Sequence, residues 1–345
     1  MIDDRLGVVI LGCAHVPHAM SYARAVTSSR TARLIGVQDA STELASRVAE
    51  GTAARQTDDP AVLLTLPGVE AAIVCSSTVQ HRALVEQAAA AGVHVLCEKP
   101  IATTVADGQA MIEACAAAGV QFHTAFVTRF YPLVERIRGI IAAGEIGEVV
   151  GMVGGNRGRP PLPPHYPAWI TTEAEAGGGA LIDHSVHVTD VMRHLSGREV
   201  VTVSAEVDDR MWTAGVDDMA LLSLVFEGGI IASVDPSWTI PAGHPWDYDF
   251  YLRIIGTSGT LAISDVTESV QVVGETGRPG MVQVPFGVDI DAAMVEAFVA
   301  SIRAGSRLEP CASGEDGLRA LEIALAGYVS SRDGRTVSLR SAPDR

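Results

Sequence analysis

The sequence predicts a two-part α/β protein: an N-terminal doubly wound parallel sheet, then an α+β part built on a mainly antiparallel open sheet. Short apolar strands alternate with helical segments over residues 1–126, which is typical of a parallel sheet covered on both faces. Closely spaced strand-like runs dominate the second part. The chain has 345 residues, more than most single domains, so two domains are expected.

The first part reads as five strands separated by helices. Leu6 to Leu11 is a continuous apolar run ending at Gly12, as expected of a strand buried on both faces. Further strands are expected at residues 33–37, 69–75, 94–97 and 121–125. Helices are expected from about residue 17 and at 42–50, 79–91 and 103–118, the last two closed by Gly92 and Gly119. Right-handed crossovers would then give a doubly wound sheet, the first domain, at residues 1–126.

The second domain is expected to occupy residues 127–345 and to contain the substrate-binding and oligomerisation surfaces. Helices are expected at 130–143 and 178–195, and strands at 149–156, 200–207, 219–226, 230–234, 250–255 and 261–264. The turn Glu227-Gly228-Gly229 is typical of an antiparallel pair. The proline-rich segment 159–167 is expected to be a loop. Two last helices, 292–303 and 315–332, are expected to pack back on the first domain.

Composition favours an enzyme that acts on a small molecule. There are 41 acidic and 25 basic residues, a formal charge of −16, which repels nucleic acid and anionic membrane surfaces. The five cysteines are scattered without a Cys-x-x-Cys pair, so they are interpreted as reduced thiols and no metal site is predicted. The start of the chain is acidic, and no apolar run is long enough to span a membrane. A cytoplasmic protein is expected.

The first strand-to-helix turn is where a dinucleotide pyrophosphate would bind backbone amides. Residues 12–17 read Gly-Cys-Ala-His-Val-Pro, so only the first glycine of a G-x-G-x-x-G fingerprint is present. Pro17 is tolerated at a first helical position, and Ala14 adds only a methyl group. An ordinary strand-turn-helix is the alternative. The residues predicted to bind the cofactor here are Gly12, Ala14, His15 and Val16.

Two further residues follow predicted strands at positions suited to a nucleotide. Asp39 lies where an acid hydrogen-bonds the adenosine ribose, and its charge favours NAD over NADP. A helix-capping aspartate is the alternative reading. Lys99, in Glu98-Lys99-Pro100, follows the strand 94–97 and would point into the ligand crevice of an open α/β sheet. A simple surface turn is the alternative there.

The run from Gly92 to Pro100, Gly-Val-His-Val-Leu-Cys-Glu-Lys-Pro, resembles the hallmark of the glucose-fructose oxidoreductase and inositol dehydrogenase family, Gfo/Idh/MocA. The resemblance extends to residues 142–147, 177–183 and 256–261. It implies a Rossmann domain and NAD(P)-dependent hydride transfer to or from a secondary alcohol of a sugar or polyol. It also implies that Glu98 and Lys99 lie near the nicotinamide. It implies cofactor contacts from Ser76, Thr78 and His81, although Ser76-Ser77-Thr78 stands where the family commonly has Thr-Pro-Asn.

A second motif lies on the helix predicted after the glycines at 177–179. Asp183 and His187 are four residues apart, so both side chains share one helix face. The resemblance implies His187 as general acid or base, with Lys99 and Asp183 fixing the substrate hydroxyl. Imidazole can accept a hydroxyl proton near neutrality, and an ammonium stabilises an alkoxide. This interpretation requires the two motifs to meet across one cleft; a structural core histidine is the alternative.

Substrate contacts are predicted from the domain junction and the proline-rich loop. Arg129 opens Arg-Phe-Tyr-Pro at the junction, where an ion pair is an equal alternative. The other predicted substrate-binding residues are His165, Tyr166 and Trp169, with Trp238, His244 and Trp246 as further candidates. All of these aromatic residues could instead be packed within loops.

Several functions other than net dehydrogenation remain open. Some family relatives oxidise a substrate transiently and then eliminate or hydrolyse it, so an NAD-dependent lyase or glycosidase is one alternative. A non-catalytic dinucleotide sensor is another. Metal-dependent hydrolysis through Asp183, His184 and His187 is disfavoured, because no H-E-x-x-H motif or cysteine set accompanies them. Relatives commonly assemble, so a homodimer or homotetramer is expected.

Overall fold

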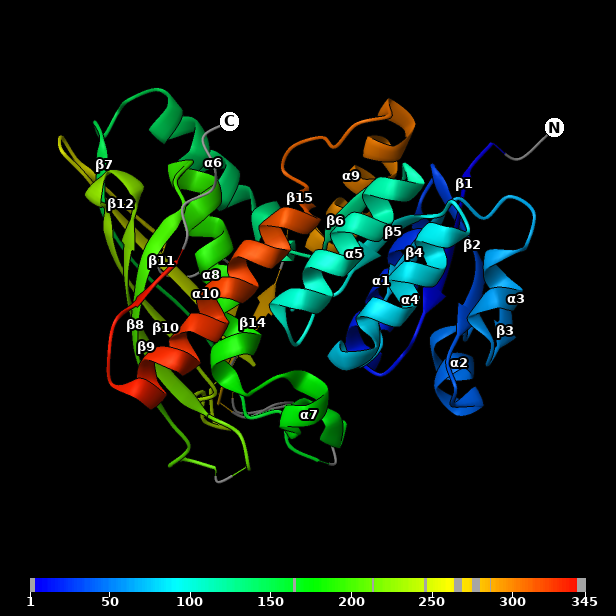
Figure 1. Cartoon of the computed structure of the whole chain (residues 1–345), viewed down its shortest axis with the longest axis horizontal. Helices are drawn as coiled ribbons and strands as arrows, with labels where there is room; N and C mark the ends of the chain where they lie inside the picture. The colour runs from blue at the N-terminus through cyan, green and yellow to red at the C-terminus, as the bar shows by residue number, and fades with distance from the viewer. Residues whose placement is uncertain are drawn as a thin grey trace. The chain divides into compact units, whose positions relative to one another are not determined.

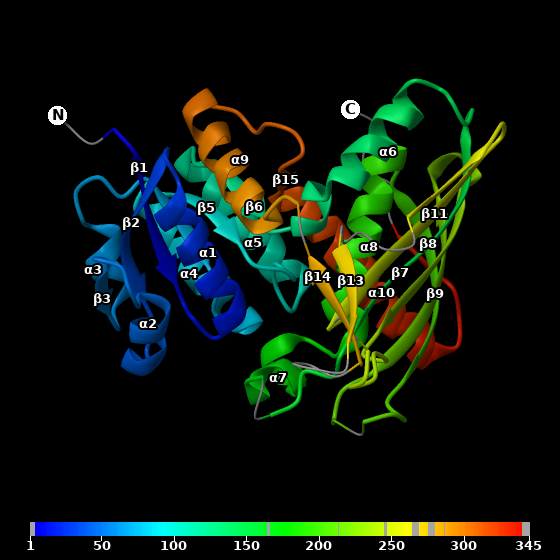
Figure 2. The same ribbon diagram turned by 180° about the vertical axis from the view of Figure 1, so that it is seen from behind.

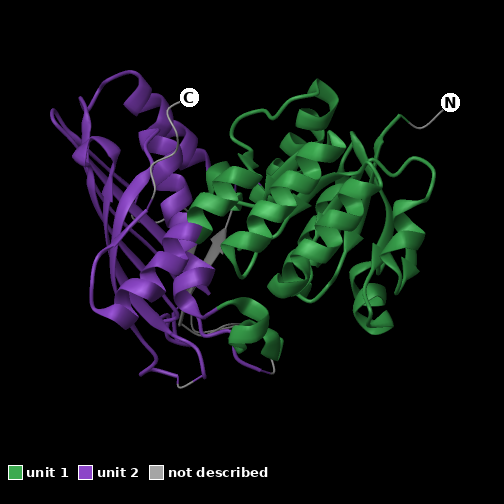
Figure 3. Ribbon diagram, viewed as in Figure 1, with its two compact units in different colours: residues 1–130, 166–177, 289–321 green, residues 131–165, 178–288, 322–345 purple. Residues whose placement is uncertain are grey.

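The computed structural model describes residues 4–163, 166–212, 214–244, 247–263, 269–274, 280–285 and 287–339. The chain divides into two compact units (Figure 3). Unit 1 contains residues 1–130, 166–177 and 289–321, and unit 2 contains residues 131–165, 178–288 and 322–345. This division differs from the expected one, 1–126 and 127–345, because two segments from the second half of the sequence belong to unit 1. The helix expected at 292–303 does pack on the first part of the chain, as predicted, whereas residues 166–177 were expected in the second domain.

Unit 1 is built on a seven-stranded sheet with the order β15-β6-β5-β4-β1-β2-β3. Its first six strands in the sequence are parallel, and β15 pairs antiparallel with β6. The strands are β1 (Leu6–Leu11), β2 (Ala32–Gln38), β3 (Arg55–Thr57), β4 (Ala71–Val74), β5 (His94–Cys97), β6 (Phe122–Thr124) and β15 (Ala312–Ser313). The strand order reverses on either side of β1, as in a doubly wound fold.

Helices cover both faces of this sheet. Helices α4 and α5 lie over one face (Figure 1), and α1 and α9 lie over the other (Figure 2). Side-chain caps from Ser41, Asp59, Thr104 and Asp289 begin α2, α3, α5 and α9. The helical elements of unit 1 are α1 (Val16–Ser28), α2 (Thr42–Val48), α3 (Pro60–Leu64), η1 (Thr78–Gln80), α4 (His81–Ala90), α5 (Val105–Ala118), η2 (Val127–Phe130), η3 (Ala168–Thr171), α7 (Glu173–Ala176) and α9 (Ile290–Ala304).

The core on the α1 side of this sheet is completed by α9. Val8 and Ile10 of β1 are fully buried there. Val295 and Phe298 of α9 belong to the same cluster, each 1% exposed. Burying one such side chain stabilises a fold by about 1.5–3 kcal/mol. A segment nearly 300 residues from the start of the chain is therefore part of the core formed by the first strand.

Unit 2 is built on a second seven-stranded sheet with the order β12-β11-β7-β10-β9-β8-β16. Only β7 and β10 pair in parallel, so the predicted mainly antiparallel sheet is confirmed. Its strands are β7 (Val149–Gly158), β8 (Val200–Asp208), β9 (Met219–Phe226), β10 (Ile231–Ser237), β11 (Tyr248–Gly256), β12 (Thr260–Ile263) and β16 (Val337–Ser338). A separate antiparallel pair consists of β13 (Ser269–Gly274) and β14 (Gly280–Pro285).

One face of the unit 2 sheet is covered by helices. Helix α8 (Ala180–Ser196) packs on β7 and β10, and α6 (Pro132–Ala142) packs on α8. Helix α10 (Gly314–Asp333) belongs to unit 2 from Glu322 onward, and η4 (Glu227–Gly229) joins β9 to β10. Residues of β9 alternate between buried and exposed, as in a sheet covered on one side. Among the described residues, no helix has the length and hydropathy needed to cross a bilayer.

Candidate active site

The turn between β1 and α1 is fixed by a glycine, as predicted for a cofactor turn. Gly12 has φ +78°, and a Cβ there would lie 2.5 Å from the Cβ of Ser76, so no other residue fits. The Gly12 amide donates to the Gln38 carbonyl at 2.8 Å, and the His15 amide donates to the Cys75 carbonyl at 3.2 Å. The described residues provide no acceptor for the amides of Ala14 and Val16. These two groups lie at the N-terminus of α1, where an anion is favoured.

Asp39 follows β2 and is held in place by two backbone amides. Its Oδ2 accepts the Cys13 amide at 2.6 Å, and its Oδ1 accepts the Ser41 amide at 2.7 Å. The carboxylate is half-buried and therefore keeps an exposed side. Its position joins the turn after β1 to the start of α2, whose N-cap is Ser41 and not Asp39. The cofactor contact of Asp39 stays a prediction.

Trp169, predicted to contact substrate, lies against the cofactor turn within unit 1. Its indole N–H donates to the Ala14 carbonyl at 3.1 Å, and its ring meets the His15 ring edge-on with centroids 6.3 Å apart. Tyr166 is in the same segment and is half-buried. His165 and Trp246 lie outside the described residues. Trp169 therefore fixes the peptide that follows Ala14.

The loop after β4 lies beside the same turn. Ser76 packs against Gly12, and Thr78 begins η1 and is 2% exposed. His81 is 1% exposed, with Nδ1 3.1 Å from the Ile101 carbonyl and Nε2 3.3 Å from the Ser76 carbonyl. Burial lowers the pKa of His81, so the ring is neutral and donates to one carbonyl at a time. His81 thus holds the loop after β4 in place by hydrogen bonding to these carbonyls.

The turn that carries Lys99 is organised around the buried side chain of Glu98. The Glu98 amide extends the sheet by donating to the Val74 carbonyl at 3.0 Å, and its carboxylate is 3% exposed. Its Oε1 accepts His18 Nδ1 at 2.8 Å and the Tyr22 hydroxyl at 2.5 Å. Its Oε2 accepts the Lys99 amide at 3.0 Å. Lys99 itself is half-buried.

Charges around Glu98 keep its carboxylate ionised. Burial alone raises the pKa of Glu98, but the charge and hydrogen bond of His18, with His15 and Lys99, outweigh it and lower that pKa below its usual range. Burial lowers the pKa of His18, but the Glu98 carboxylate outweighs burial and raises it. Both shifts favour the ion-paired form of Glu98 and His18.

Asp183 and His187 lie one turn apart on α8 in unit 2, and His187 is 8% exposed. Asp183 Oδ2 accepts the indole N–H of Trp238 at 3.3 Å and lies 3.1 Å from His184 Nε2. His184 Nδ1 lies 3.0 Å from the Asn156 carbonyl of β7. The Asp183 carboxylate is therefore held from two sides by groups of its own unit.

The N-terminus of α8 is held by Asp217, which the sequence did not reveal. Its Oδ1 accepts the Gly179 amide at 2.8 Å, and its Oδ2 accepts the Leu181 amide at 2.7 Å. The Tyr328 hydroxyl also donates to Oδ1, at 2.7 Å. A Cβ on Gly179 would lie 1.9 Å from the Asp217 carbonyl oxygen, and one on Gly178 would lie 2.1 Å from the Tyr328 hydroxyl. The glycines thus allow this close approach, which sets the position of α8.

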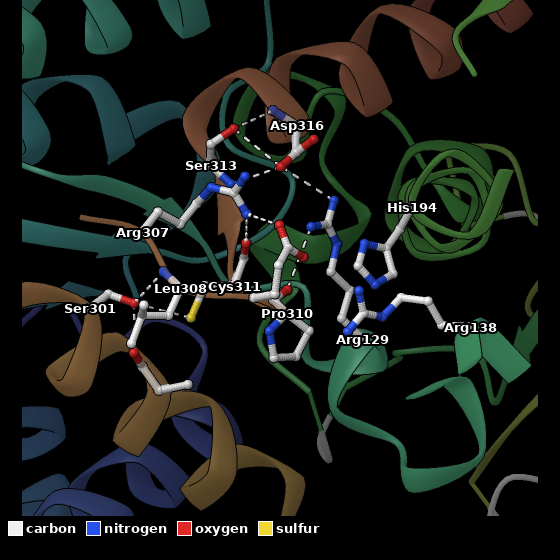
Figure 4. A network of polar contacts seen from close by, with 12 residues as sticks. Arg129, Arg138, His194, Ser301, Arg307, Leu308, Pro310, Cys311, Ser313 and Asp316 are labelled. Atoms are coloured by element: carbon white, nitrogen blue, oxygen red, sulfur yellow. Dashed lines mark hydrogen bonds and ion pairs between the residues drawn. The ribbon is translucent and has the colours of Figure 1, made fainter. Parts of the chain in front are cut away.

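Arg129, the other predicted substrate residue, is buried within unit 1 (Figure 4). Its guanidinium lies 3.3 Å from the Asp316 carboxylate and donates to the Pro310 carbonyl at 3.5 Å. Asp316 also accepts the Ser313 amide and hydroxyl. These contacts join η2 to β15 and the start of α10, and they account for burial of the Arg129 charge without a substrate.

The structure thus brings the predicted residues into two groups. In unit 1, the cofactor turn, Asp39, the loop after β4 and the lysine turn all follow carboxyl ends of neighbouring strands or begin α1. In unit 2, Asp183 and His187 share α8. Residues that sequence reasoning missed are His18, Tyr22, Asp217, Trp238 as a partner of Asp183, and Tyr328. A His and a Tyr four residues apart on α1 were a readable signal, whereas Asp217 had none.

Comparison with known proteins covers both parts of the chain. Residues 6–126 match the oxidoreductase family with an NAD-binding Rossmann fold, and residues 134–262 match the GFO/IDH/MocA C-terminal domain. The chain is 31% identical to myo-inositol 2-dehydrogenase of Thermotoga maritima over 290 residues, 81% of this chain and 83% of that protein. It is 28% identical to scyllo-inositol 2-dehydrogenase (NAD(+)) of Bacillus subtilis over 344 residues, 97% and 96% of the two chains.

Solved structures show the same fold. GenD2 from gentamicin A biosynthesis, crystallised in complex with NAD, superposes with a TM-score of 0.89 at 23% identity, covering 99% of this chain and 98% of GenD2. The aldose-aldose oxidoreductase from Caulobacter crescentus, complexed with glycerol, gives a TM-score of 0.80 at 26% identity, covering 97% of this chain and all of that one (100%).

Proposed function

The chain belongs to the GFO/IDH/MocA oxidoreductase family, and from this premise we propose that it oxidises a ring hydroxyl of an inositol-like polyol or a sugar with His187 as the base. The family confirms the predicted resemblance, the fold class and the NAD cofactor. The chain is an NAD-dependent oxidoreductase that transfers hydride to or from sugar-like substrates. The observation that supports His187 is its place on α8, one turn from an Asp183 carboxylate already fixed by Trp238.

The cofactor turn fits NAD on structural grounds. Gly12 lets the turn pack directly against Ser76, where a Cβ would collide, and the amides of Ala14 and Val16 suit the pyrophosphate. The half-exposed Asp39 carboxylate suits the adenosine ribose hydroxyls. When bound, NAD supplies the hydride acceptor. Binding and orientation of the dinucleotide are the tasks of these residues.

Three side chains are assigned roles in the removal of the hydroxyl proton. His187 takes the proton of the substrate hydroxyl, since a secondary alcohol cannot release hydride while it keeps that proton. Lys99 stabilises the developing alkoxide charge. Asp183 orients the substrate, its carboxylate accepting a hydrogen bond in a fixed direction. The two motifs come from different units of the chain, and the proposal requires both to act on one substrate molecule.

The test of this function is a panel of inositols, sugars and sugar acids incubated with the protein and NAD. Accumulation of NADH with a ring polyol is the expected result. Substrate consumption without NADH would instead indicate the lyase or glycosidase alternative, in which oxidation is transient. Tight NAD binding without turnover of any alcohol or carbonyl compound would indicate a dinucleotide sensor.

Asp39 is expected to select NAD over NADP. Asp39→Asn removes the charge that repels a 2′-phosphate, and its one carbonyl oxygen can still accept one of the two amides, that of Cys13 or that of Ser41. We expect the ratio of kcat/KM for NAD to kcat/KM for NADP to fall by at least about tenfold, about 1.4 kcal/mol. Asp59→Asn, at the start of α3, is the matched control and should leave the ratio unchanged. A wild-type preference for NADP would contradict the assignment.

The exposed face of the unit 2 sheet is proposed to bind a second copy of the chain. It presents Val153, Leu221 and Ile231, which are 40%, 53% and 65% exposed, on three adjoining strands. These exposed apolar side chains lie on one face of the sheet, which favours a self-complementary interface. Leu221→Arg is expected to shift the protein from dimer or tetramer to a smaller species in analytical ultracentrifugation. Leu308→Arg, at a 40% exposed site in unit 1, is the control, and equal effects of both changes would contradict the proposal.

A further inference from the structure

Two side chains of α1 hold a buried acid of the lysine turn, and the mechanism above gives them no role. His18 and Tyr22 are four residues apart, so they project from one face of the helix. Both donate to the same oxygen of Glu98, at 2.8 Å and 2.5 Å. Neither contact is needed to form the sheet, because the Glu98 amide already bonds the Val74 carbonyl.

The second carboxylate oxygen of Glu98 holds the backbone of Lys99. Oε2 accepts the Lys99 amide at 3.0 Å, so the carboxylate fixes the plane of the peptide from which the lysine side chain starts. A continuous path of hydrogen bonds therefore runs from α1 through Glu98 to the backbone of Lys99. Helix α1 begins at the cofactor turn and also holds Glu98. It therefore contacts both the turn predicted to bind the cofactor and the turn that carries Lys99.

The charges around His18 favour its protonated form. Glu98 lies at one side, and Asp291 of α9, bonded by the Ser21 hydroxyl at 2.5 Å, adds a second negative charge. Lys99 opposes protonation, and the His15 ring stacks on His18 with centroids 3.7 Å apart. Burial, Glu98 and Asp291 raise the pKa of Tyr22, and burial with Glu98 raises that of Cys75, so both stay neutral.

From this geometry we infer that His18 is a positioning residue: its imidazolium anchors the Glu98 carboxylate, and Glu98 in turn orients the peptide that carries Lys99. The inference rests on the proposed function for the role of Lys99. The contact that gives His18 this task is its hydrogen bond to Glu98. Tyr22 is the neutral second anchor of the same oxygen.

This arrangement predicts how kcat changes with pH. The pKa of His18 is raised, so the cation that anchors Glu98 persists to higher pH than an ordinary imidazolium and is lost as pH rises through that raised value. The kcat for alcohol oxidation should therefore rise as His187 loses its proton and fall again as His18 loses its own. The falling limb belongs to His18, and removing the imidazole should remove it.

The experiment compares wild type with His18→Asn, which keeps a donor nitrogen but no charge. We expect kcat to fall about 10- to 100-fold at the wild-type optimum, as for a slightly displaced catalytic group, with the Kd of NAD within about threefold of wild type. The alkaline fall in kcat should be absent. His94→Asn is the matched control, since His94 is at the opposite end of β5 and an Asn oxygen can still accept the Gln121 amide. It should keep the wild-type profile.

A second readout needs no turnover and separates this inference from the proposed function. The His18 imidazole of the intact protein should titrate above its ordinary value by NMR, and Glu98→Gln should return it toward that value. An alkaline fall in kcat that persists in His18→Asn, or an unshifted His18 titration, would overturn the inference even in an active enzyme. If no substrate is found, the proposed function fails. The NMR titration still tests whether His18 and Glu98 form an ion pair. If His18→Asn does not fold, wild type alone tests the inference. The pKa of His18 measured by NMR should then equal the pKa of the alkaline fall in kcat, and a mismatch would overturn the inference.

Discussion

Replacing His187 with alanine should lower kcat by about 10²- to 10⁴-fold, the usual contribution of a positioned general base. The physical reason is that no other group would take the hydroxyl proton as hydride leaves the substrate carbon. His187 lies on α8, in unit 2, while the cofactor turn lies in unit 1, so the Kd of NAD should stay within about twofold. Steady-state rates of NADH formation and calorimetric titration with NAD measure the two quantities.

A matched control for this change is available on the same helix. His194 is in the last turn of α8 and pairs with Glu135 of α6 at 3.7 Å. His194→Asn should leave kcat near the wild-type value while disturbing the same helix to a similar extent. Wild-type turnover in His187→Ala would refute the role of His187. An equal loss of kcat in both variants would attribute the effect to helix packing instead.

Asp217→Asn should produce the largest loss of stability among single changes near α8, about 2–4 kcal/mol. The carboxylate accepts two backbone amides and one hydroxyl, whereas an amide group would place N–H donors against N–H or O–H donors. Asp183 and His187 lie in the first two turns of the helix that these bonds position, so kcat should fall as well. Urea denaturation measures the free energy of unfolding, and NADH formation measures kcat.

Two comparison variants sharpen this result. Tyr328→Phe removes only one of the three donors and should cost about 1 kcal/mol. Asp208→Asn removes an exposed ion pair with Arg210 and should change stability by less than about 0.5 kcal/mol. If Asp217→Asn were no more destabilising than Asp208→Asn, the amides of Gly179 and Leu181 would have to be satisfied in another way.

Elements with a strong local pattern were predictable from sequence. The all-apolar run of β1 gave its exact bounds, and the capped, periodic stretch of α8 gave a helix within two residues of the observed one. Short elements were not predictable: β3, β15 and β16 have only two or three residues, too few to show a period. The β13 and β14 pair was also missed, although each strand has valines at alternating positions, Val270 and Val272 in β13 and Val282 and Val284 in β14.

For the candidate site, sequence reasoning found residues but not their partners. Asp39 was identified by its position after a strand, and Glu98 and Asp183 by the resemblance to the family. Their contacts join residues far apart in the chain: His18 and Glu98 are 80 positions apart, and Gly179 and Asp217 are 38 apart. No local periodicity encodes such pairs. Trp169 illustrates the same limit, because its contact with Ala14, 155 positions away, ties it to the cofactor turn of unit 1.

The place of α9 in the core with β1 bears on how the protein is made. A ribosome releases the chain from its N-terminus, so Val8 and Ile10 emerge long before Val295 and Phe298, the side chains that cover them. Until α9 is synthesised, the apolar side chains on this face of the nascent sheet stay exposed, and chaperones would bind them. A fragment that stops before residue 289 should therefore aggregate when expressed alone, although it contains the whole run of parallel strands.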